Sequence, residues 1–162
     1  MRRLHCTLVA AALAALAMPA TAASTTAVTT VNVVKPVSLS KLQDLDFGTL
    51  TFAGFTGTRT ITISQSGVLS CAADIVCSGT AKPARFNVQG TNKLTAYIRV
   101  SGGNLSNGSE TIAFTPIAPA SLYLPNSGAP GIDFNIGGSI VIDPALVGGI
   151  YSGTMNVTAD YQ

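Results

Sequence analysis

The chain ends with the stretch Gly149-Ile-Tyr-Ser-Gly-Thr-Met-Asn-Val-Thr-Ala-Asp-Tyr-Gln162, which alternates between apolar and polar residues. Successive side chains of a strand point to opposite faces, so every second residue shares a face. One face collects a glycine and the apolar side chains, namely Gly153, Met155, Val157, Ala159 and Tyr161. This pattern predicts a half-buried strand. Chain ends fray unless a sheet holds them, and we therefore expect this strand to have a fixed place in a sheet.

Working back from this stretch, short alternating runs rich in Val, Ile and Thr recur between turn residues such as Gly102-Gly103 and Asn107-Gly108. Helix signals are few, so the sequence predicts an all-β sandwich. The expected strands are Ala27–Val34, Val37–Lys41, Leu45–Phe52, Thr58–Ser64, Ala84–Gln89, Leu94–Val100, Thr111–Ile117, Ile132–Ile142 and Ile150–Tyr161. The proline-rich segment Pro116–Pro130 is expected to be an irregular crossover.

The N-terminal residues have the features of an export signal. Arg2 and Arg3 precede an apolar run from Leu8 to Met18, and Ala20-Thr21-Ala22 provides small residues for cleavage. We expect residues 1–22 to be a secretory signal peptide. Residues 36–162 then have the length of one β-sandwich domain, and residues 23–35 form an extension before it.

The extension carries its own strand pattern. Ala27, Thr29, Val31 and Val33 share one face, and no charged residue occurs between Ala23 and Val34. An arm of this kind can pair with a strand of its own domain or with a neighbouring molecule. We therefore regard these four residues as a candidate donor strand.

Charge and histidine content exclude several function classes. Removing the signal peptide takes away Arg2, Arg3 and His5, which leaves seven basic and seven acidic residues and no histidine. A neutral chain gives no reason to expect nucleic acid or an anionic membrane as a partner. Without imidazole the mature chain also lacks the commonest group for proton transfer. We expect no cofactor.

Cys71 and Cys77 remain, with five residues between them. In an exported chain a closely spaced pair predicts a disulfide. A zinc site is the alternative, but two thiolates without histidine do not complete four ligands, so we expect no metal.

Two patterns resemble catalytic groups. Ser38-Leu-Ser-Lys41 matches the Ser-x-x-Lys pattern of serine acyl-transferases, but it lies in a strand-like region, and the lysine must sit one helical turn from the serine. Asp44 and Asp46 resemble a carboxylate pair, yet alternation with Leu45 and Phe47 predicts simple solvent-facing positions. We therefore expect no catalytic residue and no enzyme activity.

Three motifs together resemble a known family. They are Leu45-Asp46-Phe47-Gly48-Thr49-Leu50 after Pro36-Val-Ser-Leu39, then Ala84-Arg-Phe86-Asn-Val88-Gln-Gly90, and finally Gly149-x-Tyr151-x-Gly153-Thr154 with Val157 and Tyr161. The chain resembles the DUF4402 domain family of small exported bacterial proteins, and it is similar in outline to pilin subunits of chaperone–usher pathways.

The pilin resemblance implies an immunoglobulin-like sandwich that lacks one strand. Such pilins have a penultimate aromatic residue, here Tyr161, and a glycine fourteen residues from the end, here Gly149. In these families a periplasmic chaperone fills the open groove first, and the N-terminal arm of the next subunit then replaces it. This exchange is strand addition, in which backbone hydrogen bonds give affinity and side chains set the register.

The resemblance thus implies a structural subunit of a bacterial surface fibre. Its expected partners are identical or related subunits joined head to tail, a periplasmic chaperone and an outer-membrane usher, and its expected location is outside the cell after export through the periplasm. The alternatives are a self-complemented surface or secreted protein, a carbohydrate-binding adhesin and, last, an unrecognised hydrolase.

Overall fold

The computed structural model describes residues 22–162, so the predicted signal peptide lies outside them except for Ala22. The described chain is built from antiparallel strands and turns, without helices, which confirms the all-β sandwich. No helix in residues 22–162 is long and apolar enough to span a membrane.

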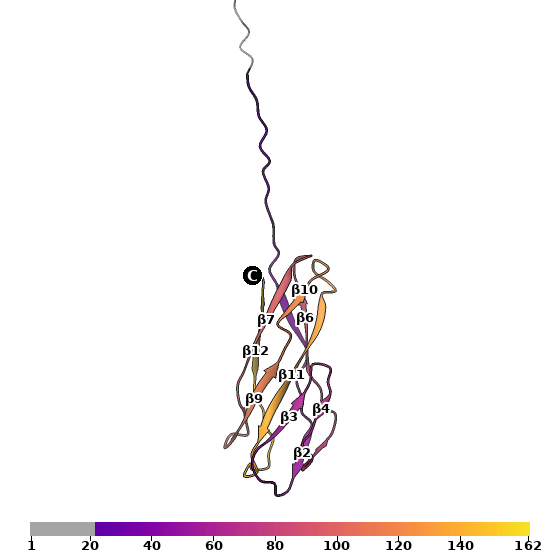
Figure 1. Cartoon of the computed structure of the whole chain (residues 1–162), viewed down its shortest axis with the longest axis vertical. Coiled ribbons are helices and arrows are strands. Elements are labelled where there is room, and N and C mark those ends of the chain that lie inside the picture. Colours follow the sequence, from indigo (N-terminus) through magenta and orange to yellow (C-terminus); the bar gives the residue numbers. More distant parts are fainter. Residues whose placement is uncertain (1–21) are drawn as a thin grey trace, which may run out of the picture. The chain divides into compact units, whose positions relative to one another are not determined.

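Twelve strands make up the domain (Figure 1). They are β1 (Ser38–Gln43), β2 (Thr49–Phe52), β3 (Arg59–Ile63), β4 (Leu69–Ser70), β5 (Ile75–Ser78), β6 (Ala84–Gln89), β7 (Thr95–Gly102), β8 (Leu105–Ser106), β9 (Thr111–Ile117), β10 (Ser121–Tyr123), β11 (Ile132–Ile142) and β12 (Met155–Asp160).

The eleven-residue strand β11 organises the largest sheet. Its first half pairs with β6, which also pairs with β1. Its second half pairs with both β3 and β9. A second sheet has the order β10-β7-β12, and a small third one joins β2 to β5. All of these pairings are antiparallel.

Two apolar clusters fill the space between the sheets, because alternate residues of the strands point inward. The first joins β6, β7 and β11, and in it the rings of Phe86 and Phe134 stack with centroids 5.8 Å apart. The apolar face of β12 packs against this cluster. The second lies around Ile61, Ile75 and Ile140. No buried polar side chain occurs in the described residues.

Several expected strands agree with the structure and others do not. The predictions for β6, β9 and β11 match residue by residue. The expected strand Leu45–Phe52 is shorter, because Gly48 has a φ of +74° and breaks the extended backbone before β2. The last strand covers Met155–Asp160 and not the expected Ile150–Tyr161. The segment Pro116–Pro130 contains β10 in place of a wholly irregular crossover.

The prediction of a strand in the N-terminal arm is wrong for the single chain. Ala27–Val34 was expected to form a strand, but residues 22–37 belong to no strand in the structure. A strand needs a partner for its backbone hydrogen bonds. Val31 is 85 % exposed and Val33 is 76 % exposed, and Ala27 and Thr29 are also exposed. Residues 22–32 form a part separate from Val33–Gln162.

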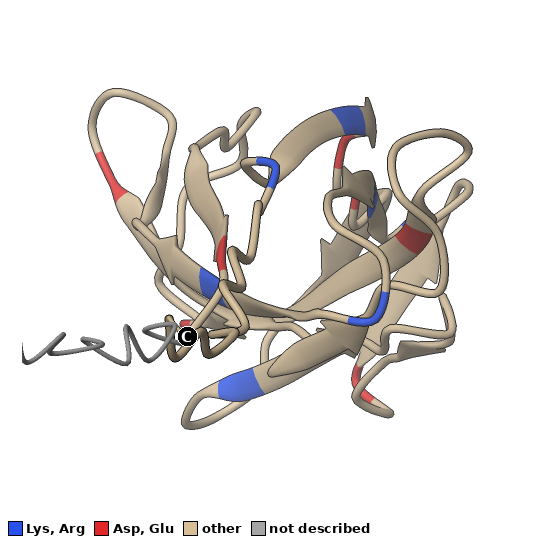
Figure 2. Cartoon of the chain, turned by 90° about the horizontal axis from the view of Figure 1, so that it is seen from above, with Lys and Arg blue, Asp and Glu red and all other residues tan. Residues whose placement is uncertain are grey.

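Cys71 and Cys77 are joined in a disulfide, as expected. Beside it, the Arg59 side chain contacts the Asp74 carboxylate at 2.5 Å and lies over the ring of Phe55 at 5.1 Å. The hydrogen bond from Arg59 holds the pKa of Asp74 below its ordinary value. Basic and acidic residues are interspersed along the strands and loops of the domain (Figure 2).

Candidate functional site

The C-terminal strand β12 pairs on one side only. Its residues run opposite Tyr97–Gly102 of β7, and within the described chain no strand pairs with its other edge. The side chains of Met155, Val157 and Ala159 point inward onto the apolar cluster, as the sequence predicted. One long edge of backbone is therefore open.

The hydrogen bonds on the paired side identify which backbone groups are open. Ser152 exchanges two hydrogen bonds with Ser106, at 2.8 and 3.0 Å, and Thr154 O accepts one from Gly103 N at 3.4 Å. In an antiparallel ladder alternate residues turn their N–H and C=O groups to opposite edges. The intervening residues, Tyr151, Gly153, Met155, Val157 and Ala159, therefore direct theirs to the open edge.

A second chain segment faces this edge across a gap. β1 pairs only with β6, and the chain then continues through residues 44–48. Asp46 N donates to Lys82 O at 2.9 Å, and Lys82 N donates to Asp46 O at 2.8 Å. By the same alternation, Leu45 and Phe47 turn backbone groups away from Lys82. Some Cα atoms of β1 and β12 approach within 8 Å, but no ladder joins the two strands.

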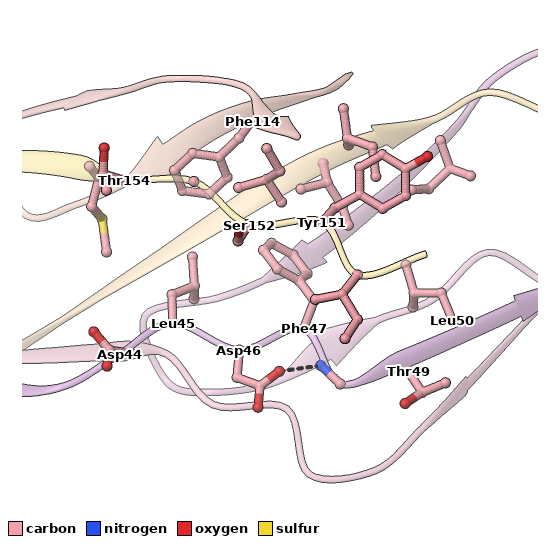
Figure 3. Close-up of a pocket in the computed structure, with 18 of the residues that line it drawn as sticks. Asp44, Leu45, Asp46, Phe47, Thr49, Leu50, Phe114, Tyr151, Ser152 and Thr154 are labelled. Atoms are coloured by element: carbon pink, nitrogen blue, oxygen red, sulfur yellow. Dashed lines mark hydrogen bonds between the residues drawn. The ribbon is translucent and has the colours of Figure 1, made fainter. Parts of the chain in front are cut away.

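A groove of about 920 Å³ lies between these two segments. Its lining is largely apolar and comes from both sides, as Figure 3 shows for Leu45, Phe47, Phe114 and Tyr151. Phe47 and Phe114 meet edge to face, with ring centroids 6.4 Å apart. Deeper lining residues are Phe86, Ile112, Ile140 and Ile142. The sandwich therefore carries an apolar groove between two backbone edges that pair with no strand of the described chain.

The turn at one wall of the groove explains the Leu-Asp-Phe-Gly motif. The Asp46 carboxylate accepts a hydrogen bond from Gly48 N at 2.8 Å, drawn as a dashed line in Figure 3. Gly48 has positive φ, and a Cβ there would lie 2.6 Å from Ser78 O. The motif thus fixes the point where the groove wall turns into β2. Asp46 therefore stabilises this turn. The feature that suggested a catalytic carboxylate pair was only its spacing from Asp44.

Beside the C-terminal end of β12, Thr91 joins the start of the domain to its last strand. Thr91 N donates to Tyr161 Oη, and a Cβ on neighbouring Gly90 would overlap that hydroxyl. Lys35 N donates to Thr91 Oγ1 at 2.7 Å, and the Thr91 hydroxyl donates to Lys35 O at 3.3 Å. The penultimate aromatic residue therefore anchors β12, and the root of the arm is held beside it.

At the other end, Tyr151 and Glu110 hold the loop before β12. Tyr151 Oη lies 3.0 Å from Glu110 Oε2, and Val147 N donates to the same carboxylate oxygen at 2.8 Å. Burial raises the pKa of Tyr151 above its ordinary value, and the hydrogen bond with Glu110 adds a smaller rise. The hydroxyl therefore remains a donor. Gly153 permits close approach, since a Cβ there would lie 2.8 Å from Asn104 O. Gly149 is exposed near Asn107.

The residues considered for catalysis do not form a reactive group. Lys41 Nζ contacts Asp44 Oδ1 at 2.7 Å, and both side chains are largely exposed. No bond joins Ser38 to Lys41 among the interactions of the described residues. Residues 22–162 contain no cluster of three or more His, Cys, Asp or Glu side chains that could bind a metal.

Sequence reasoning found β12 but not the extent of the groove. Alternation predicts inward positions for Leu45 and Phe47 on a continuous strand, without indicating a second groove wall, and it places Ile140 and Ile142 only within the strand Ile132–Ile142. The signal that could have found the wall is the positive-φ glycine after Asp46, which ends a strand segment while Leu45 and Phe47 still alternate inward.

Comparison with known proteins adds the family. No curated protein matches the chain. The family described as "Domain of unknown function (DUF4402)" matches residues 37–161, which include both walls of the groove and β12. The chain therefore belongs to the DUF4402 family.

Proposed function

We propose that this protein is a structural subunit of a bacterial surface fibre and that the N-terminal arm of a second copy fills the groove. One observation carries the proposal: the open backbone edge of β12 lies beside an apolar groove with a second open wall. Unpaired edges are templates for strand addition, which uses backbone groups for affinity and alternate side chains for register.

The arm has sufficient length for this groove. Residues 23–34 precede the anchored Lys35, and at about 3.3 Å per residue they reach about 40 Å when extended. The part of this edge that lines the groove, from Tyr151 to Val157, is about 23 Å long by the same measure. An arm can therefore cover this part of the edge and keep several residues to connect two subunits.

The chemistry of the arm also fits. It presents Ala27, Thr29, Val31 and Val33 on one face and has no charged residue before Lys35. Burying an unpaired charge in an apolar groove is costly, and an uncharged arm avoids that cost. Ala27, Val31 and Val33, which are exposed in the single chain, would be covered in the polymer.

The root of the arm favours insertion into another copy over insertion into its own groove. Insertion in the same chain would place the arm against β1 as a hairpin around Pro36. Two-residue hairpin turns use positive φ, which proline cannot adopt. A longer loop would release Lys35 from Thr91 or remove arm residues from the groove. The self-complemented protein is therefore the second candidate.

Head-to-tail insertion does not close on itself and so produces a filament. The proposal includes a periplasmic chaperone that covers the groove before assembly and an outer-membrane usher that exports the subunits. It also includes removal of residues 1–22 and a location at the cell surface. No cofactor and no chemical turnover are needed.

The size of the purified protein tests the proposal. Residues 23–162 should form a ladder of oligomers in size-exclusion chromatography with light scattering, whereas residues 35–162 should not. A peptide of residues 23–34 should bind the truncated protein one to one and raise its melting temperature. A monomeric full chain whose truncated form still binds the peptide would indicate the self-complemented protein. Absence of peptide binding would contradict both.

A further inference from the structure

The outer face of the β10-β7-β12 sheet carries the two aromatic side chains that lie outside the cores. The chain has six phenylalanines, four tyrosines and no tryptophan, all within residues 22–162. All six phenylalanines, Tyr151 and Tyr161 belong to the two apolar clusters. Only Tyr97 and Tyr123 do not, and both lie on this one sheet.

The strand register places these two tyrosines as diagonal neighbours. Tyr97 of β7 lies opposite Ser121 of β10, and Tyr123 lies opposite Thr95. Directly opposite residues share a face, and diagonal neighbours are about 7–8 Å apart. Tyr123 is 58 % exposed and Tyr97 is partly exposed, whereas the intervening Ala96 and Leu122 face the core. Two ring surfaces are thus available side by side.

Hydrogen-bonding groups surround the rings on the same face. Tyr97 lies opposite Asp160 of β12, and Arg99 lies opposite Thr158. Both charged side chains are exposed, and neither has an ion-pair partner within the described residues. The other members of the face are Ser101, Asn156 and Ser121. One cation and one carboxylate leave the face without net charge.

From this juxtaposition we propose that the outer face of β10-β7-β12 binds the sugar rings of an uncharged glycan. A sugar ring presents C–H groups that pack on an aromatic ring and hydroxyls that need donors and acceptors. Tyrosine combines an apolar ring with a polar end, and the neighbouring Arg99 and Asp160 provide a hydrogen-bond donor and an acceptor. A protein partner would need an apolar centre in the patch, but beyond the two rings this face is polar.

This face is distinct from the groove, because Tyr97, Arg99 and Tyr123 alternate along their strands with the side chains that point into the core. Binding does not depend on the proposed assembly. In a fibre, each subunit would present a copy of the same face, and weak sites would combine into avid attachment to a glycan-covered surface. The two proposals can therefore fail separately.

Ligand-observed saturation-transfer NMR on residues 23–162 tests this inference, with methyl glycosides of neutral hexoses and N-acetylhexosamines as probes. We expect saturable binding to at least one probe. Tyr123→Ala should weaken it about three- to tenfold through loss of one stacking contact, whereas Tyr123→Phe should retain it to within about twofold. Arg99→Ala should also weaken it. Val76→Ala, at an exposed apolar position on β5, should leave it unchanged.

Since Tyr123 is exposed, circular dichroism should show that its variants are folded. Failure of every glycoside to bind, or equal binding by wild type and Tyr123→Ala, would overturn the proposal. Concentration-dependent association of the truncated chain 35–162 that Tyr123→Ala abolishes would also overturn it, because the face would then be a protein interface. Loss of polymerisation in an arm variant, with glycan binding intact, would concern only the fibre.

Discussion

At the scale of single residues, Gly48 shows how a sequence motif fixes a wall of the groove. The Asp46 carboxylate holds Gly48 N, and the positive φ of Gly48 ends one strand segment before the next begins. The motif was recognisable in the sequence, but its role was not, because alternation alone predicted one continuous strand over Leu45–Phe52. The requirement for a glycine also comes from the Ser78 backbone of β5, which leaves no space for a Cβ at position 48.

Gly48→Ala should destabilise the domain more than the same change at Gly54. Both glycines have positive φ, which costs an L-residue about 1–2 kcal/mol. At Gly48 a Cβ would also lie 2.6 Å from Ser78 O, whereas at Gly54 no atom lies within 4 Å. We expect a loss of about 3 kcal/mol or more at Gly48 and about 1 kcal/mol at Gly54. Urea unfolding measures both, and equal losses would mean that the close contact does not constrain the turn.

The Arg59–Asp74 pair should give the domain an acid-dependent stability. The hydrogen bond from Arg59 lowers the pKa of Asp74, so the folded state favours the ionised carboxylate. The contribution is fully present above the unfolded pKa of about 3.9 and is lost as pH falls through the lower folded pKa. The stability difference between wild type and Asp74→Asn should be constant near neutral pH and disappear in acid.

A double-mutant cycle with Arg59→Gln provides the control, because the coupling between the two residues should follow the same pH dependence. Urea unfolding at a series of pH values from neutral to about 2 measures it. A coupling that persists after Asp74 is protonated would show that packing of Arg59 on Phe55, and not the ion pair, links the two positions.

At the scale of elements, the sequence predicted the long strands well and the short ones poorly. β6, β9 and β11 have enough alternating residues to be recognised by period. β4 and β8 contain two residues each, too few for any period, and β5 begins within the disulfide loop and contains Cys77, which closes it. These short strands form because they pair with neighbouring strands, so tertiary pairing and not the local sequence pattern determines where they lie.

The arm illustrates the opposite case, since its pattern predicts a strand but the single chain offers it no partner. Alternation over Ala27–Val33 is a property of the sequence, whereas a strand also needs an open edge to pair with. In the proposed fibre, the open edge of β12 in another copy meets that need. The sequence therefore indicated both strands but could not show the groove that relates them.

Substitutions in the arm should separate its two faces. Val31→Asp should abolish polymerisation, because it would bury a charge in the groove. Asn32→Asp places the same charge on the alternate face and should leave polymerisation intact. Both residues are exposed in the single chain, so neither change should alter its folding. Sedimentation velocity of the two variants measures the effect. Loss of assembly in both would indicate that net charge, and not strand register, controls it.

At the scale of the whole molecule, the domain is a sandwich with an apolar groove between two edges that pair with no strand of the described chain. Two apolar clusters and antiparallel pairing hold the domain, and Thr91 ties the root of the arm to the end of β12. Whether the arm enters its own groove or that of a neighbour decides between a monomer and a fibre.

Cross-linking between isotopically distinct copies tests this choice most directly. Asp44, which is exposed at the rim of the groove, is replaced by photoreactive benzoyl-phenylalanine in both unlabelled and ¹⁵N-labelled protein. The two are unfolded together, refolded as a mixture, irradiated and analysed by mass spectrometry. The account predicts cross-links between the groove rim and residues 23–34, with mixed light–heavy pairs at the level expected from random copies. Cross-links found only within light or within heavy chains would contradict it, because the arm would then fill its own groove.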